Sequence, residues 1–288
     1  MIKEYKEIKV ELSENILTIM INRPERHNAY TELLNAEMRD ALAEADADDE
    51  VRVIILTANP EGRTFCAGMD LGAGGETFNV KSVPEMEHRD SGGVLCLAIY
   101  NVKKPVIAAI NGSAVGVGFT MTLPCDFRIV SNKAKLGAVF VRRGIFLDGA
   151  ASYFLPRLVG MANALKIALT GKLWKAEELE STGLYYKIVD PEDVMPEAYA
   201  LAKDIAVNCA PVSTVMIKRQ LWTMQQADSP MAAHEVESLL YWNLGDSPDA
   251  SEGVTAFLEK RDPKWNLSVS KDMPHFYPWW PNRTFRNK

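Results

Sequence analysis

The stretch AAINGSAVGVGFTMTLPCD, residues 108–126, decides the fold of this chain. It begins at the end of a buried strand predicted over 105–110, passes through two glycine turns and enters a short helix. Small residues in such turns let the backbone approach a ligand, and N–H groups at a helix start have no partner within the helix. Taken alone, glycine after a strand more often marks only a turn, and the stretch lacks the full G-x-G-x-x-G pattern of a dinucleotide site.

Strands and helices alternate around this unit. Two strands joined by a turn are predicted within 7–23, and further strands at 51–57 and 126–131. Thr31 is the predicted N-cap of a helix whose apolar residues repeat at helical spacing through Ala45. This order favours an α/β core with mostly parallel pairing. From Gly149 onward the periodicity is helical, in the segments 150–158, 161–170, 176–182, 196–208, 212–226, 230–244 and 250–260.

The composition indicates an ordinary globular protein. The 288 residues are 47% hydrophobic and 24% charged, with a net charge of −6 and no basic stretch that would suit nucleic acid. The N-terminus lacks the apolar core of a secretory signal, and apolar runs such as PVIAAI fall far short of the ~20 residues that span a bilayer. We expect neither nucleic acid nor a membrane as a partner.

The cysteines and histidines indicate no metal site. The four cysteines show no C-x-x-C spacing and lie on segments with a buried pattern, which fits a reducing, cytoplasmic location. His27, His234 and His275 have no ligand-like spacing.

Two other segments stand out. Residues 72–93 are glycine-rich and polar, as in a mobile loop beside a site. The tail after Pro263 carries six aromatics, which we expect to dock on the body or on a neighbouring subunit.

A second glycine turn, TFCAGMDL at 64–71, follows the strand at 51–57. With the first turn and several further segments, it gives the chain a resemblance to the crotonase superfamily, the enoyl-CoA hydratase/isomerase family. The resemblance runs from about residue 7 to 265. The matching segments are INRPERHNAY (21–30), FCAGMDL (65–71), KKPVIAAINGSAVGVG (103–118), CDFRIVS (125–131), LPRLVG (155–160) and SEGVTAFLEKRDPKW (251–265).

The resemblance implies an α/β fold, a spiral of ββα units with a helical C-terminal region that packs trimers, often as a dimer of trimers. We therefore divide the chain into a spiral core at 1–200, a helical oligomerisation region at 201–265 and an aromatic-rich tail at 266–288. The implied substrate is an acyl-CoA thioester. No cofactor is expected, since coenzyme A is part of the substrate.

The resemblance also implies an oxyanion hole made by two backbone N–H groups, which by position belong to Met69 and Val117. Such donors stabilise the negative charge that develops on the thioester oxygen, each by about 3–4 kcal/mol. Arg26 lies where relatives contact the CoA nucleotide, and the alternative is an arginine that only faces solvent. The full set of expected substrate-binding residues is Arg26, Ala29, Ala67, Gly68, Gly116, Thr120, Phe140 and Tyr153. For Thr120 a place in the helix wall, and for Tyr153 a place in the core, is the better expectation.

Hydratases of this family use two glutamates, and by alignment Thr120 and Phe140 stand in their places. The departure puts two-acid hydration in doubt. Asp148 remains, the one acidic residue in RRGIFLDGAASYFLPRLVG, 142–160. A carboxylate placed among apolar side chains is costly without a partner or a task. Some isomerases of the family carry their catalytic glutamate here, and a dehalogenase branch carries a nucleophilic aspartate, but that branch's helper histidine would fall at Gly93.

Asp148 is therefore expected to be the acid/base of an enoyl-CoA isomerase, or of a hydratase that uses one carboxylate. One carboxylate suffices for a 1,3-proton shift. To act first as an acid, its pKa would have to rise by about three units. Three alternatives stay open: hydrolysis of an acyl-CoA or C–C bond, a non-catalytic acyl-CoA-binding relative, and a purely structural Asp148 that caps the helix after it.

Overall fold

The strands divide between two sheets. In the computed structural model, which describes residues 3–281 and 283–286, the larger sheet has the order β1-β2-β3-β5-β7-β10 and the smaller has the order β4-β6-β8-β9. Pairing is parallel except for β1–β2 and β8–β9. The bounds are β1 Ile8–Ser13, β2 Ile16–Ile21, β3 Val53–Ala58, β4 Thr64–Cys66, β5 Val106–Ile110, β6 Ser113–Val115, β7 Phe127–Ser131, β8 Lys135–Gly137, β9 Trp174–Lys175 and β10 Lys187–Val189.

The chain winds as a spiral of ββα turns. Three times in succession, a strand of the larger sheet is followed by one of the smaller sheet: β3 by β4, β5 by β6, and β7 by β8. Helix α2 (Ser91–Asn101) then returns the chain from β4 to β5, and α3 (Val117–Thr120) returns it from β6 to β7. The expected α/β spiral is confirmed.

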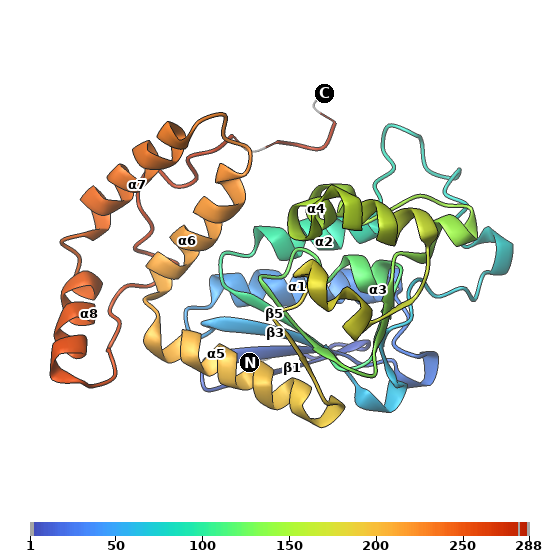
Figure 1. Ribbon diagram of the computed structural model, residues 1–288, viewed down its shortest axis with the longest axis horizontal. Coiled ribbons are helices and arrows are strands. Elements are labelled where there is room, and N and C mark those ends of the chain that lie inside the picture. Colours follow the sequence, from blue (N-terminus) through green and yellow to red (C-terminus); the bar gives the residue numbers. More distant parts are fainter. Residues whose placement is uncertain (1–2, 282, 287–288) are drawn as a thin grey trace.

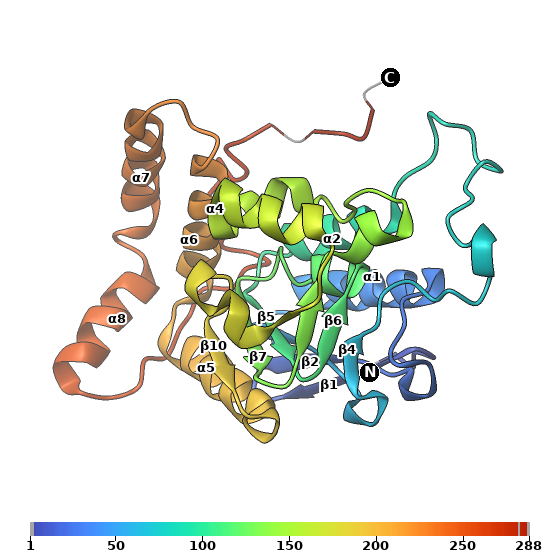
Figure 2. The same cartoon turned by 45° about the vertical axis from the view of Figure 1, so that its right-hand side comes forward.

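Helices cover the larger sheet on both sides (Figures 1 and 2). Helix α5 (Val194–Asn208) packs alanines at 198, 202 and 206 against isoleucines of β3, β5 and β7, which lie on one face of the sheet. The other face joins the main core, with α1 (Glu32–Ala47), α2 and the smaller sheet. Thr31 caps α1 as predicted, since its hydroxyl accepts the Leu34 N–H.

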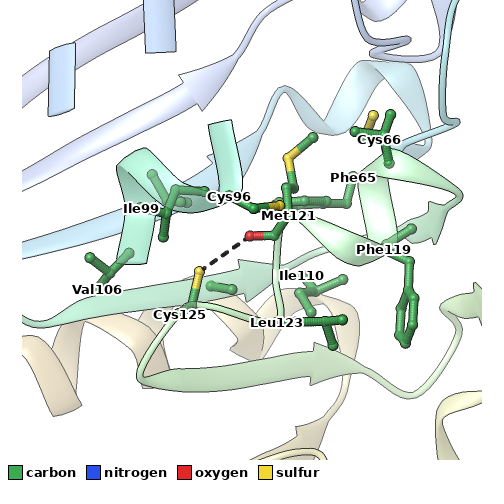
Figure 3. Packing of buried hydrophobic residues seen from close by; sticks show 14 of the residues in the cluster. Phe65, Cys66, Cys96, Ile99, Val106, Ile110, Phe119, Met121, Leu123 and Cys125 are labelled. Atoms are coloured by element: carbon green, nitrogen blue, oxygen red, sulfur yellow. Dashed lines mark hydrogen bonds between the residues drawn. The ribbon is translucent and has the colours of Figure 1, made fainter. Parts of the chain in front are cut away.

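Thiols and apolar side chains fill the core between α2, α3 and the two sheets, as Figure 3 shows. Cys66, Cys96 and Cys125 are buried there, and Cys125 Sγ donates to the Met121 carbonyl. All four cysteines are free thiols, and Cys209 is partly exposed. The predicted burial of the cysteine segments therefore holds for three of the four.

The back half is helical, as predicted. Its helices are α4 (Ala151–Thr170), α5, α6 (Pro211–Met224), α7 (Pro230–Leu244) and α8 (Pro248–Glu259). The expected break between 150–158 and 161–170 occurs at Gly160, whose φ of 73° and ψ of 160° interrupt α4. Helices α6, α7 and α8 form an arm set to one side of the spiral, while residues 72–90 project on the opposite side (Figures 1 and 2).

The aromatic tail docks on the body of the same chain. Trp265 Nε1 donates to the Val207 carbonyl at 2.9 Å, and Trp279 Nε1 donates to Thr223 Oγ1 at 3.2 Å. Phe276, Tyr277 and Trp279 pack against the apolar cluster formed by α6, α7 and Val269. Docking on the body, one of the two expectations for the tail, is confirmed.

Two negative findings concern the described residues, 3–281 and 283–286. No single helix in them is long and apolar enough to cross a membrane. Only the helix pair Pro191–Asn208 and Pro211–Met224, which is bent by 115°, has the length and apolar composition of a membrane span in these residues. Within the same residues, no group of three or more His, Cys, Asp or Glu side chains is arranged to hold a metal ion.

Candidate active site

The two glycine turns lie against each other because the strands before them are neighbours. Strands β4 and β6 pair in parallel, with Cys66 opposite Ala114. Gly68 has a φ of 98° and Gly116 a φ of 56°, which favour glycine. A Cβ on Gly116 would lie 3.9 Å from Gly68 Cα, and one on Gly68 would lie 3.0 Å from the Val115 carbonyl oxygen. The absence of side chains is therefore what lets these turns meet.

The N–H groups of Met69 and Val117 take no part in the local backbone hydrogen bonding. Met69 forms a parallel bridge with Tyr30, but the bonds of that bridge use the N–H groups of Tyr30 and Asp70. Val117 is the first residue of α3, where a backbone N–H has no partner inside the helix. Within the described part of the chain, neither N–H donates to a protein acceptor. Each is therefore available to a ligand oxygen.

Asp148 lies beside the second turn and is bound from α3. Thr120, which is fully buried, donates its hydroxyl hydrogen to Asp148 Oδ1 at 2.7 Å. A Cβ on Gly92 would lie 3.1 Å from both Asp148 Oδ2 and Val117 Cγ2, so these two side-chain atoms flank the same point of α2. The candidate carboxylate and one of the two candidate N–H donors therefore lie close together.

Burial is the main reason why the pKa of Asp148 rises from its usual value near 4 to about 7. The hydrogen bond from Thr120 opposes the rise, and the negative charge of Asp90 adds to it. The sequence analysis required a rise of about three pKa units for Asp148 to act first as an acid. Its surroundings provide that rise, so both protonation states are populated near neutral pH.

Asp148 does not cap helix α4 with its side chain. The N-cap of α4 is Ala150, at a φ of 51°, and it makes no side-chain cap hydrogen bond. Asp148 takes part through its backbone only, since its carbonyl accepts the Ala151 N–H. The capping alternative for its carboxylate is therefore wrong, and the carboxylate is turned toward Thr120 instead.

Arg26 lies at the outer edge of the first turn and pairs with Asp70 at 2.9 Å. This bond from Arg26 is the main reason why the pKa of Asp70 falls to about 2, with further bonds from the Gly72 N–H and from Arg23. Asp70 therefore stabilises the turn. Half of the Arg26 side chain stays exposed, so it remains accessible to an anionic ligand.

Of the other predicted binding residues, Ala29, Ala67 and Phe140 lie at the two turns, whereas Tyr153 contacts Arg157 and Gln226. Ala67 is exposed beside the buried Gly68, and Ala29 is buried, with its carbonyl accepting from Arg23. Phe140 is 6% exposed, and a Cβ on Gly116 would lie 3.9 Å from its ring. Tyr153 is half-buried on α4, where its hydroxyl accepts from Gln226 Nε2 at 2.9 Å. Tyr153 therefore links α4 to the residues that follow α6.

The sequence analysis missed two residues of the site, Asp90 and Gly92. Asp90 caps α2 by accepting the N–H groups of Gly92 and Gly93, and it also accepts the N–H of Gly149. Both were assigned to the loop 72–93. The sequence R-D-S-G-G does contain a signal, since an aspartate before a serine is a good helix N-cap.

Comparison with known proteins identifies the family of this chain. The enoyl-CoA hydratase/isomerase family model matches residues 11–268. The chain belongs to this family. Among curated relatives, the enoyl-CoA hydratase ACTT3 of Alternaria alternata is 42% identical over 255 residues, covering 88% of this chain and 83% of the relative. The 1,2-epoxyphenylacetyl-CoA isomerase of Escherichia coli is 30% identical over 262 residues, covering 88% and 96%.

Solved structures agree with the sequence relatives. A probable enoyl-CoA hydratase/isomerase from Mycobacterium abscessus superposes with a TM-score of 0.84 at 34% identity, covering 90% of this chain and 98% of that one. As an enoyl-CoA hydratase/isomerase, the chain is an enzyme of the crotonase fold. Thr120 and Phe140, where our alignment expects the two glutamates of hydratases, are both buried, and Thr120 is the hydrogen-bond partner of Asp148.

Proposed function

We propose that this enzyme isomerises the double bond of an enoyl-CoA thioester by a 1,3-proton shift, with Asp148 as the proton carrier. The observation that carries the proposal is the buried Asp148 carboxyl beside the Val117 side chain, whose pKa of about 7 lies near neutral pH. A general acid–base group works best when its pKa is near the operating pH. Because one group both takes and returns the proton, two further acids are not needed at Thr120 and Phe140.

In the proposed reaction, the N–H groups of Met69 and Val117 bind the thioester oxygen. Ionised Asp148 removes a proton from C2 of a 3-enoyl thioester, and the electron pair of that C–H bond moves toward the oxygen as a dienolate forms. Protonated Asp148 then delivers the same proton to C4, which leaves the double bond between C2 and C3. Each N–H donor contributes about 3–4 kcal/mol to stabilising the charged oxygen. The reaction consumes no cofactor.

Hydration of a 2-enoyl thioester is the second candidate. The same pKa favours it, since an ionised Asp148 can take a proton from water attacking C3 and then return a proton to C2. Relatives named as enoyl-CoA hydratases, such as ACTT3, also support it. In both reactions the oxyanion donors and the proton carrier are the same groups.

The substrate is an acyl-CoA thioester in this proposal. The exposed half of Arg26, beside Ala29, is placed to contact the CoA phosphates at the entrance, since a guanidinium binds phosphate well. Ala67, Gly68 and Gly116 form the narrow wall next to the thioester. Phe140 and Tyr153 border the acyl group. Support for this arrangement comes from the positions of Gly68, Gly116 and Phe140 at the two turns and from the family match.

We propose that the active form is a homotrimer or a dimer of trimers. Helices α4, α6, α7 and α8 present large apolar side chains to solvent, and such surface is typical of subunit contacts. They are Met161, Leu165, Leu169, Ile217, Leu221, Met231, Leu239, Tyr241, Trp242, Val254, Phe257 and Leu258. The partner is therefore a second copy of this chain. A cytoplasmic location is also proposed, supported by the four free thiols.

The test uses 3-enoyl-CoA as substrate and follows the absorbance of the conjugated 2-enoyl-CoA product. The wild type is expected to produce this absorbance, and Asp148→Asn to lower kcat by at least about a hundredfold, as for loss of a general acid–base. Asp272→Asn is the matched control, because within the described residues the Asp272 carboxylate binds only Ser268 in the tail. It should leave kcat unchanged.

Other results of this assay would support the alternative functions. Loss of 2-enoyl-CoA absorbance in water would select hydration, and release of free thiol would select hydrolysis. Full activity of Asp148→Asn would end the proposed role of the carboxyl. If no CoA thioester bound to the wild type, a catalytic function on such substrates would be wrong.

A further inference from the structure

Asp90 connects the start of α2 to the segment that carries Asp148. Its Oδ1 accepts the Gly92 N–H at 3.1 Å, and its Oδ2 accepts the N–H groups of Gly93 at 2.8 Å and Gly149 at 3.0 Å. The first two bonds are those of an ordinary N-cap. The third is not needed for capping, and it holds the residue that directly follows Asp148. The partner glycine is 59 positions away along the chain.

We propose that Asp90 is a positioning residue that fixes the Asp148 carboxylate against α2 and keeps the first amides of that helix from binding it. The inference rests on the proposed function of Asp148 as proton carrier. Asp90 itself is not expected to touch the substrate.

The Asp148 carboxylate lies next to the N-terminus of α2. A Cβ on Gly92 would be 3.1 Å from Asp148 Oδ2, so the carboxylate lies beside the first turn of the helix. Free N–H groups at a helix start attract anions and stabilise their charge. Asp90 already occupies the N–H groups of Gly92 and Gly93. Asp90 therefore keeps these two N–H groups from binding ionised Asp148.

The segment after Asp148 is fitted closely, which explains why it needs an anchor. Gly149 has a φ of 67°, and a Cβ there would lie 2.7 Å from Thr120 Oγ1 and 3.0 Å from Cys96 Sγ. The backbone thus passes directly over α2 and α3. The bond from Gly149 to Asp90 and the bond from Thr120 to Asp148 fix two successive residues of this segment.

The charges around Asp148 support a specific role for Asp90. The thiols of Cys96 on α2 and Cys66 on β4 interact with Asp148, but burial raises the pKa of both thiols and keeps them neutral. From α3 the hydroxyl of Thr120 contributes a hydrogen bond. Burial is the main cause of the raised pKa of Asp148, and the Asp90 charge increases it further.

Asp90→Asn tests the proposal without removing the helix cap, because asparagine caps helices about as well as aspartate. The variant loses the negative charge and one acceptor oxygen. Loss of the negative charge lowers the pKa of Asp148. Loss of the acceptor oxygen can free a glycine N–H, and a freed N–H that binds Asp148 lowers this pKa further. The acid limb of kcat/KM should therefore move to lower pH. Because the weaker base reacts more slowly, kcat should fall about tenfold, while KM changes less than about threefold.

Asp272→Asn serves again as the control, since its carboxylate accepts a backbone N–H far from the site. It should shift neither kcat nor the acid limb. If Asp90→Asn kept the wild-type kcat and the wild-type acid limb of the kcat/KM profile, the proposal would be overturned. Thermal unfolding at one pH would confirm that both variants are folded.

A spectroscopic arm separates this inference from the proposed function. The infrared C=O band of protonated Asp148, isolated by difference from Asp148→Asn, titrates with the carboxyl whether or not the enzyme turns over the chosen substrate. In Asp90→Asn the band should disappear at lower pH than in the wild type. An unchanged titration would refute the role of Asp90 even if isomerase activity were found, and a shifted titration in an inactive enzyme would refute only the proposed reaction.

Discussion

At the scale of single residues, the candidate site depends on one carboxyl group that is largely shielded from water. Asp148 has a folded-state pKa of about 7, against about 3.9 for a free aspartate. Between these values the folded protein retains a proton that the unfolded chain releases. The free energy of unfolding therefore falls as the pH rises from about 4 to 7. The burial that raises this pKa thus destabilises the fold at neutral pH.

Asp148→Asn should consequently stabilise the protein at high pH. Asparagine keeps the acceptor for Thr120 and carries no charge to desolvate. We expect the free energy of unfolding to increase by about 1–4 kcal/mol at pH 8, with the gain falling to about 0.5 kcal/mol or less near pH 4, where the folded state is protonated and the unfolded chain is about half protonated. Thermal melts of wild type and variant at pH 4, 6 and 8 measure it. An equal difference at all three values would contradict the raised pKa.

Gly92 is expected to be required because of what it lies against. Alanine there would place a methyl group 3.1 Å from both Asp148 Oδ2 and Val117 Cγ2. Because reacting groups tolerate little displacement, kcat should fall about tenfold or more. Gly75→Ala is the matched control, since a Cβ on Gly75 meets nothing within 4 Å. Steady-state kinetics of the two variants would decide, and equal activities would show that the close contact is not critical.

At the scale of elements, the turn after β6 places the Val117 N–H. Gly116 has a φ of 56° and a ψ of −126°, a conformation that residues with a side chain avoid. Gly116→Ala should strain this turn by about 1–3 kcal/mol and move the N–H, lowering kcat about ten- to a hundredfold. Gly160→Ala, at a φ of 73° and a ψ of 160° with no heavy atom within 4 Å of its Cβ, also places a side chain in a conformation that favours glycine, but on α4 and not at the turn. If both variants lost activity equally, the effect would be one of stability and not of the oxyanion donor.

The elements also show how far the sequence predicts this protein. Strand β3, with six buried residues, and helix α1, with its threonine cap, match their predictions within two residues. The strands of the smaller sheet have only two or three residues each, too few for a periodic pattern. Helix α2 was missed because it begins with Ser-Gly-Gly and is apolar on most faces. Local patterns therefore find long elements and miss short ones.

The same reasoning explains which site residues were found. Asp148 stands out because it is charged among apolar neighbours. Asp90 lies in the polar run H-R-D-S, where a charged side chain is unremarked. Its importance comes from a bond to Gly149, distant in sequence, which only the fold brings near. The surroundings of Asp148 likewise required the structure, since burial cannot be read from one position.

At the scale of the whole molecule, the arm of α6, α7 and α8 is the expected subunit contact (Figure 1). Phe257 is 81% exposed on α8. Phe257→Asp is expected to reduce the mass in light scattering from a multiple of three of the 32.0 kDa chain mass toward a single chain. Val80→Asp, in the loop on the opposite side, should leave the assembly unchanged. A wild type that is monomeric at micromolar concentration would contradict the proposed trimer.

The most direct test is a crystal structure with a non-reactive acyl-CoA thioester bound. The thioester oxygen is expected about 2.7–3.1 Å from both the Met69 and Val117 nitrogens. A carboxylate oxygen of Asp148 should lie about 3–3.5 Å from C2. A thioester oxygen held by other donors, or a C2 atom out of reach of Asp148, would contradict the mechanism.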